Sequence, residues 1–216
     1  MSYYGEVVQV VSLSLFISIT STIIASLAGM LLAIPIALKD FKLKRYIIRI
    51  SETFMSIPPV LMGLVVYLLL SRKGPLGELG LLFTPTAMII AQSLLVFPIV
   101  FGLTVSAIGT RGRKIKKNCI ALGAGSRDTL ILIIRECKIQ LLAVAAAGFG
   151  RAISEVGAVM MVGGNIKGET RVMTTYIALE TGQGNFNKAI TIGVILLFVS
   201  FMVNFMLHGL SKIDEK

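Results

Sequence analysis

Two opposite charges stand inside an otherwise uncharged stretch of this 216-residue sequence, and their types and spacing could do chemistry. Arg151 and Glu155 are the only charged residues between Ile139 and Ile166. They are four residues apart, so on a helix they share one face and can neutralise each other. Charges in hydrocarbon usually face a protein interior or a water-filled cavity. Two interpretations remain open: the pair belongs to a polar pathway or subunit interface, or it is a structural ion pair. Because Glu155 would repel an anion, the pair argues against a tight anion site.

Other chemistries find little support in the sequence. The single histidine, His208, lacks a partner that would suggest catalysis, and Cys119 and Cys137 belong to no CxxC or Cys/His cluster. No glycine-rich phosphate loop followed by Lys-Ser or Lys-Thr is present. We therefore expect no catalytic residues, no metal site and no ATP bound by this chain through such a loop.

The composition is that of an integral membrane protein. Apolar residues make up 55% of the chain and charged residues only 15%, with a mean hydropathy of +0.86, whereas soluble domains carry about 25% charged residues. The net charge of +10 would suggest nucleic acid in a soluble protein. In a membrane protein, basic loops set the orientation instead, so no nucleic-acid partner is expected.

Five stretches are long and apolar enough to cross a bilayer, which requires about 20 residues. We predict spans at residues 12–38, 50–70, 82–107, 139–166 and 189–211. The predicted fold is therefore all-α: one polytopic domain over residues 1–216, with a long loop at about residues 108–138.

The distribution of basic residues predicts the orientation. Fifteen Lys and Arg residues fall in the loops after spans one and three and in the tail, against five on the other side. Because cytoplasmic loops carry the excess of positive charge, we expect the N-terminus outside, the C-terminus in the cytoplasm and a multi-pass location in the plasma membrane.

Prolines and small residues mark special points in these spans. Pro58 and Pro59 interrupt span two, while Pro35 and Pro98 lie within spans one and three. Carbonyl groups freed by such breaks need partners from neighbouring helices or from water, so both a packing kink and a pathway lining remain open. A stripe of small residues at helical spacing predicts close packing of span one: Ser14, Ser18, Ser21, Ala25 and Gly29.

The cytoplasmic loop contains two glycines in the run Ala121, Leu122, Gly123, Ala124 and Gly125. The glycines could end one short helix, and Ser126 could cap the next, which carries the apolar run 130–134. We expect two short helices joined by an elbow at the membrane surface. The apolar face could dock on a protein or lie on lipid headgroups.

This loop resembles the coupling loop of ATP-binding-cassette importer permeases. Gly123 and Ile133 match the glycine and isoleucine of that family's pattern, whereas residues 117–119 and 135–136 differ from its Glu-Ala-Ala and Leu-Pro. Residues 150–166 look like the penultimate span of molybdate, tungstate and sulfate permeases, and the start of span two adds to this likeness. Residues 162–166, 171–175 and 179–181 are most similar to the tungstate permeases.

The resemblance implies the membrane subunit of an ATP-driven importer that moves an oxyanion into the cytoplasm by alternating access. Among the oxyanions, the resemblance favours tungstate. It implies two ATPase subunits, which hold ATP and Mg, on the coupling loops, and an extracytoplasmic binding protein near residues 163–188. Five spans are too few to enclose a wide path, so we expect a homodimer with the path at its two-fold interface. A permease for molybdate, sulfate or another small solute, and a self-contained channel or carrier, remain alternatives.

Overall fold

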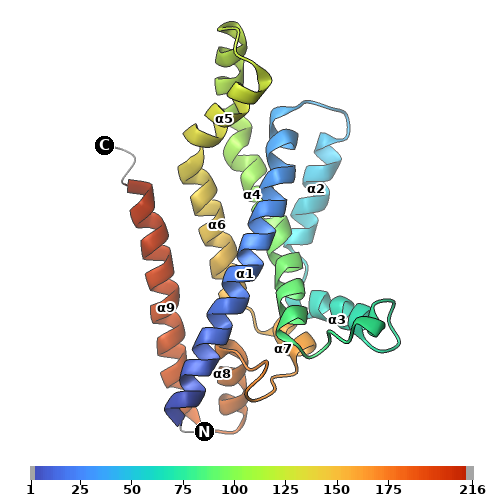
Figure 1. The fold of residues 1–216 in the computed structure, drawn as a ribbon, viewed down its shortest axis with the longest axis vertical. Coiled ribbons are helices and arrows are strands. Elements are labelled where there is room, and N and C mark those ends of the chain that lie inside the picture. Colours follow the sequence, from blue (N-terminus) through green and yellow to red (C-terminus); the bar gives the residue numbers. More distant parts are fainter. Residues whose placement is uncertain (1–2, 213–216) are drawn as a thin grey trace.

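The computed structural model describes residues 3–212, and the side chains of residues 4–206. Every regular element in this part is helical, which confirms the predicted all-α class (Figure 1). In chain order they are α1 (Tyr3–Leu38), α2 (Lys44–Met55), α3 (Pro59–Leu70), the 3-10 helix η1 (Gly77–Leu79), α4 (Pro85–Ala121), α5 (Ser126–Glu136), α6 (Lys138–Ile153), α7 (Gly157–Gly163), α8 (Met173–Gly182) and α9 (Phe186–Lys212). The expectation for His208 concerns a side chain outside the described part.

Three helices are long and apolar enough to cross a membrane by themselves. They are Tyr4–Leu38, Pro85–Ala121 and Phe186–Met206. Two bent pairs, α2 with α3 and α6 with α7, raise the number of candidate spans to five if each pair counts as one. The five predicted spans therefore correspond to three continuous helices and two broken ones.

The second predicted span, residues 50–70, is not a single helix. Its axis turns by 96° between α2 and α3, and in Figure 1 α3 projects sideways from the bundle of long helices. Pro59 disfavours a helical backbone at the preceding residue, and Pro58 accordingly has φ −58° and ψ 130°. Pro35 and Pro98, by contrast, lie inside the continuous helices α1 and α4.

The fourth predicted span, residues 139–166, is also broken. Helix α6 ends at Ile153, α7 begins at Gly157, and their axes differ by 57°. The region after it, which the predicted spans leave as a connection between the fourth and fifth, contains helix α8 with Met173, Thr175 and Tyr176 buried. Tertiary packing therefore adds a helix where the sequence predicted a loop.

Helix α1 packs along α4 through the predicted stripe of small residues. Ser14, Ser18, Ser21 and Ala25 are buried, and a Cβ added to Gly29 would lie 3.0 Å from Val100 Cγ1 on α4. The prediction that these residues permit close helix packing is confirmed.

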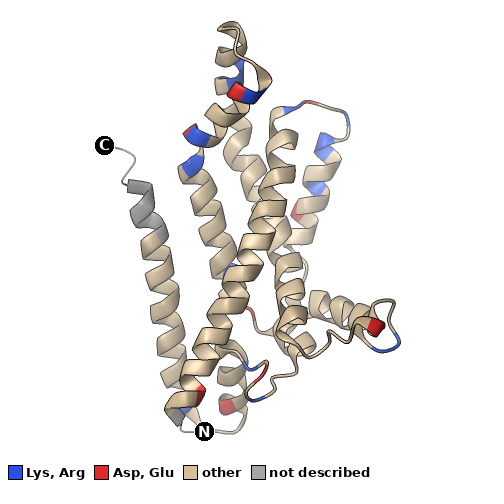
Figure 2. Cartoon of the chain, viewed as in Figure 1, with Lys and Arg blue, Asp and Glu red and all other residues tan. Residues whose placement is uncertain are grey.

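Basic residues gather at one end of the bundle. Figure 2 shows Lys and Arg concentrated on the α1–α2 loop, on α2 and around α5, at the end opposite the start of α1. This is the asymmetry counted in the sequence. Helix α9 runs towards the same end in Figure 1, as an odd number of crossings requires. Which end faces the cytoplasm stays a prediction from charge.

Candidate functional site

The break between α6 and α7 holds the intramembrane charges Arg151 and Glu155. Arg151 Nη1 donates a hydrogen bond to Glu155 Oε2 at 2.7 Å, and the side chains are 33% and 4% exposed. A shared helix face is not what joins them, because α6 ends at Ile153 and Glu155 lies in the break itself. Arg151 reaches across the end of its helix to a carboxylate that is almost fully buried.

Glu155 connects three helices. Its Oε1 accepts a hydrogen bond from the backbone N–H of Ala158, in the first turn of α7, at 3.0 Å. A carboxylate is favourable there because N–H groups at the start of a helix lack intrahelical partners. The backbone oxygen of Glu155 accepts a hydrogen bond from Thr174 Oγ1 of α8 at 2.8 Å. The carboxylate and carbonyl of one residue therefore fix α6, α7 and α8 relative to one another.

Side chains of α1 and α4 satisfy other backbone groups at this break and at the start of α8. Gln92 Nε2 of α4 donates to the carbonyl of Ala152 at 2.9 Å, and Ser21 Oγ of α1 donates to Gln92 Oε1 at 3.0 Å. The N–H of Met173, which begins α8, donates to Ser14 Oγ at 2.7 Å. Broken helices are tolerated at membrane depth only with such partners. Sequence analysis missed Gln92, although an amide within an apolar span was an available signal.

The two broken spans meet at a contact between α3 and α7. A Cβ added to Gly63 would lie 2.7 Å from the Cα of Ala158, and one added to Gly157 would lie 2.6 Å from Val60 Cγ2. Val60 follows Pro59, and Gly157 comes two residues after Glu155. The structure therefore brings the Pro58–Pro59 break and the Arg151–Glu155 break, far apart in sequence, to one junction.

We expect Gly63→Ala to destabilise this junction by about 1–3 kcal/mol, because overpacking forces backbone to move. The atom that the new methyl group would meet is backbone, which cannot turn away. Thermal unfolding of the purified protein in detergent measures the effect, with Gly193→Ala on α9 as control, since nothing lies within 4 Å of a Cβ there. Equal unfolding temperatures for the two variants would contradict the close α3–α7 contact.

The predicted elbow within residues 108–138 joins α4 to α5. The first of its two predicted helices is not a separate short helix. Helix α4 continues without interruption for 37 residues, from Pro85 to Ala121. It ends where Ala124 N donates to Cys119 O at 2.9 Å and Gly123 N donates to Ile120 O at 3.1 Å, the pair of hydrogen bonds that closes a Schellman motif. Gly123 has φ +75°, a conformation that glycine adopts without steric cost.

The predicted cap of the second elbow helix is wrong. Ser126 is the first residue of α5, and the N-cap position belongs to Gly125, which has no side chain to donate or accept. Nothing lies within 4 Å of a Cβ added to Gly123. A side chain there would therefore be strained by the backbone conformation and would not be obstructed by neighbours.

The elbow exposes apolar side chains at its tip. Leu122 is 86% exposed and Ile120 is 62% exposed, whereas Ile133 is fully buried. Ile133 packs with residues of α1, α4 and α6 in one core cluster, so it anchors α5 to the bundle and is not available to dock. Ala121, Ala124 and Gly125 are exposed beside Leu122. The solvent-facing part of the predicted coupling residues is therefore the run 121–125.

The polar residues of the 163–188 region are largely structural. Thr170, Thr174 and Thr175 are buried, and each makes hydrogen bonds within the chain, such as Thr170 Oγ1 accepting from Ile166 N at 2.9 Å. The hydroxyl groups of these three threonines are therefore engaged in hydrogen bonds inside the chain. Gly168 and Asn185 are exposed, as expected for a docking surface or a solvated connector.

Within the part of the chain that the structure describes, no group of three or more His, Cys, Asp or Glu residues is arranged to hold a metal ion. Cys119 and Cys137 are buried free thiols. Burial raises the pKa of the Cys137 thiol, which keeps it protonated and unreactive at neutral pH.

Comparison with known proteins gives a consistent result. A model of the family described as "binding-protein-dependent transport system inner membrane component" matches residues 25–212. The tungstate uptake system permease protein TupB of Peptoclostridium acidaminophilum is 48% identical over 98% of this chain and 93% of its own length. The corresponding protein of Campylobacter jejuni is 40% identical over 80% and 72%. A probable anion ABC transporter permease protein of Haloferax volcanii is 37% identical over 91% and 87%.

Proposed function

This chain belongs to the family of binding-protein-dependent transport system inner membrane components, and from that premise we propose that it is the permease subunit of an ATP-driven importer that carries tungstate into the cytoplasm. The observation that carries the choice of cargo is the 48% identity, over nearly the whole of both chains, to a tungstate uptake permease. The resemblance of residues 162–166 and 171–175 to tungstate permeases supports the same choice.

We further propose that the elbow run 121–125 receives the movement of a partner ATPase. Helix α4 is suited to carry that movement, because its 37 residues form a continuous rod about 55 Å long at 1.5 Å per residue. Gln92 lies on this rod and binds the carbonyl of Ala152 at the α6–α7 break. A displacement of the elbow would therefore reach the junction of α3 and α7 through covalent structure and one hydrogen bond.

The remaining parts of the proposal concern the assembly. Two copies of this chain form a homodimer with the path at the two-fold interface. Two ATPase subunits bind ATP and Mg at the basic end, and an extracytoplasmic oxyanion-binding protein docks at the opposite end. The charge asymmetry of the loops supports an outside N-terminus and a cytoplasmic C-terminus in the plasma membrane.

Reconstitution tests the proposed function. Proteoliposomes containing this chain, its ATPase and its binding protein should accumulate tungstate only when ATP and binding protein are both supplied. Uptake of tungstate should exceed that of molybdate and sulfate at equal concentration. Faster molybdate or sulfate uptake would overturn the choice of cargo. Uptake by this chain alone without ATP would favour a self-contained carrier or channel and overturn the importer.

A further inference from the structure

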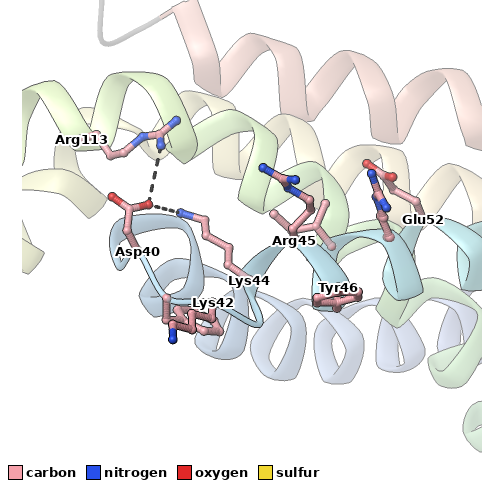
Figure 3. A pocket seen from close by; sticks show the side chains of 10 residues that line it. Asp40, Lys42, Lys44, Arg45, Tyr46, Glu52 and Arg113 are labelled. Carbon is pink, nitrogen blue, oxygen red and sulfur yellow. Dashed lines mark hydrogen bonds and ion pairs between the residues drawn. The ribbon is translucent and has the colours of Figure 1, made fainter.

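A hollow of about 740 Å³ lies at the basic end of the bundle, between the α1–α2 loop, α2 and α4 (Figure 3). Its lining includes five cationic side chains: Lys42, Lys44, Arg45, Arg49 and Arg113. Two carboxylates, Asp40 and Glu52, also line it, so the hollow carries an excess of three positive charges at neutral pH. We call this hollow the basic pocket.

The ion pairs of the basic pocket engage only part of this charge. Asp40 Oδ1 is 3.2 Å from Lys44 Nζ and 4.0 Å from Arg113 Nη1, and Figure 3 shows these two cations converging on Asp40. Among the residues that the structure describes, no carboxylate forms an ion pair with Lys42, Arg45 or Arg49. Arg45 and Arg49 are four residues apart on α2, which places them on one side of the start of that helix, and Lys42 precedes them in the α1–α2 loop.

The position of α2 indicates which kind of anion can reach the pocket. Ser51 Oγ donates to the carbonyl of Pro98 at 3.3 Å, and a Cβ added to Gly102 would lie 2.9 Å from Met55 Sδ. Both α4 residues belong to its apolar stretch, so α2 enters the membrane and Arg49 lies close to the hydrocarbon boundary. Lipid headgroups occupy that depth, whereas a soluble partner would remain outside it.

The apolar part of the lining also fits a lipid. Phe41 and Tyr46 line the basic pocket and are exposed, with relative exposures of 40% and 62%. An aromatic residue at headgroup depth contacts glycerol and the upper acyl chain. One tetrahedral oxyanion would fill only a small part of the hollow and would use none of this apolar surface.

We propose that the basic pocket binds the headgroup of an anionic phospholipid, with Arg45 and Arg49 on its phosphate and Phe41 and Tyr46 beside its glycerol region. Basic pockets between membrane helices at the cytoplasmic side are suited to anionic headgroups. The assignment to the inner leaflet rests on the proposed orientation, whereas the binding site itself does not depend on transport.

Native mass spectrometry of the purified protein in detergent tests this proposal by titration with phosphatidylglycerol and phosphatidylcholine. The wild type should retain phosphatidylglycerol more strongly than phosphatidylcholine. The double variant Arg45→Gln with Arg49→Gln should weaken phosphatidylglycerol binding by about thirtyfold, as expected for the loss of two surface cations. The charge-conserving variant Arg45→Lys with Arg49→Lys should keep most of the binding, and its retention would show that a loss in the Gln variant reflects charge.

The matched control removes two cations of the same end outside the basic pocket, Arg127→Gln with Arg135→Gln on α5, and should bind phosphatidylglycerol like the wild type. Equal weakening in the control and pocket variants would overturn the site, because it would reflect general surface charge.

A second arm of the experiment adds tungstate or sulfate to the lipid-free protein. Oxyanion binding that is lost with Arg45 and Arg49, with no preference for phosphatidylglycerol, would assign the pocket to a free oxyanion and overturn the lipid proposal. Both outcomes are independent of whether the chain imports tungstate.

Discussion

Arg151→Gln should destabilise the protein by about 3–5 kcal/mol, the cost of breaking a buried ion pair by removing one partner, and it should do more damage than Glu155→Gln. The reason is the unequal burial of the two side chains, 33% exposed for Arg151 and 4% for Glu155. Removal of Arg151 leaves a buried carboxylate without its cation. Removal of the charge on Glu155 leaves a half-buried guanidinium that can turn towards water or headgroups.

The double variant Arg151→Gln with Glu155→Gln should recover much of the stability lost in Arg151→Gln. A glutamine at position 155 carries no charge and can still accept a hydrogen bond from the N–H of Ala158, the contact that Glu155 Oε1 makes. Thermal unfolding and the yield of monodisperse protein in detergent measure the order of the three variants. A double variant no more stable than Arg151→Gln would contradict mutual neutralisation.

Gly123→Ala should reduce ATP-driven uptake by up to about thirtyfold, while Gly125→Ala should have little effect. Gly123 has φ +75°, where a residue with a Cβ costs about 1–2 kcal/mol, and that energy corresponds to a five- to thirtyfold change in the ratio of native to altered elbow. Gly125 has φ −67° and ψ 160°, which any residue adopts. The two substitutions add the same methyl group two residues apart, and a Cβ at Gly125 would make only an ordinary contact, 3.5 Å from Asp128 Oδ2, so the backbone conformation is the main difference.

Two further variants separate strain from obstruction. Gly123→Leu should impair uptake about as much as Gly123→Ala, since nothing lies within 4 Å of the Cβ position, and Gly123→Asn should be milder because asparagine tolerates a positive φ. Uptake and ATPase co-purification in proteoliposomes are the measurements. Normal uptake in Gly123→Leu would contradict a coupling role and would mean that the elbow is only a connection at the membrane surface. A leucine variant far worse than the alanine variant would mean that the partner ATPase approaches the glycine directly.

Several features follow from the sequence because they depend on local composition. The apolar stretches predict membrane helices, and the loop charges predict one strongly basic end, which the structure shows on α2 and around α5. The small residues of α1 predict close packing, because a helix presents one side chain every three or four residues to the same neighbour. Gly123 predicts a helix end because only glycine takes a left-handed conformation without cost.

Tertiary structure alone decided where the broken spans meet. The sequence marks Pro58–Pro59 and Arg151–Glu155 as unusual, but nothing in either segment says that Val60 packs on Gly157 or that Gln92 binds the carbonyl of Ala152. The tertiary structure also placed Ile133 in the core and buried Thr170 and Thr174. The local sequence indicates which backbone groups lose their helical hydrogen bonds at a break. In a membrane those groups must find other hydrogen-bond partners. Which side chain satisfies each one depends on how distant helices pack, and only the assembled bundle determines that.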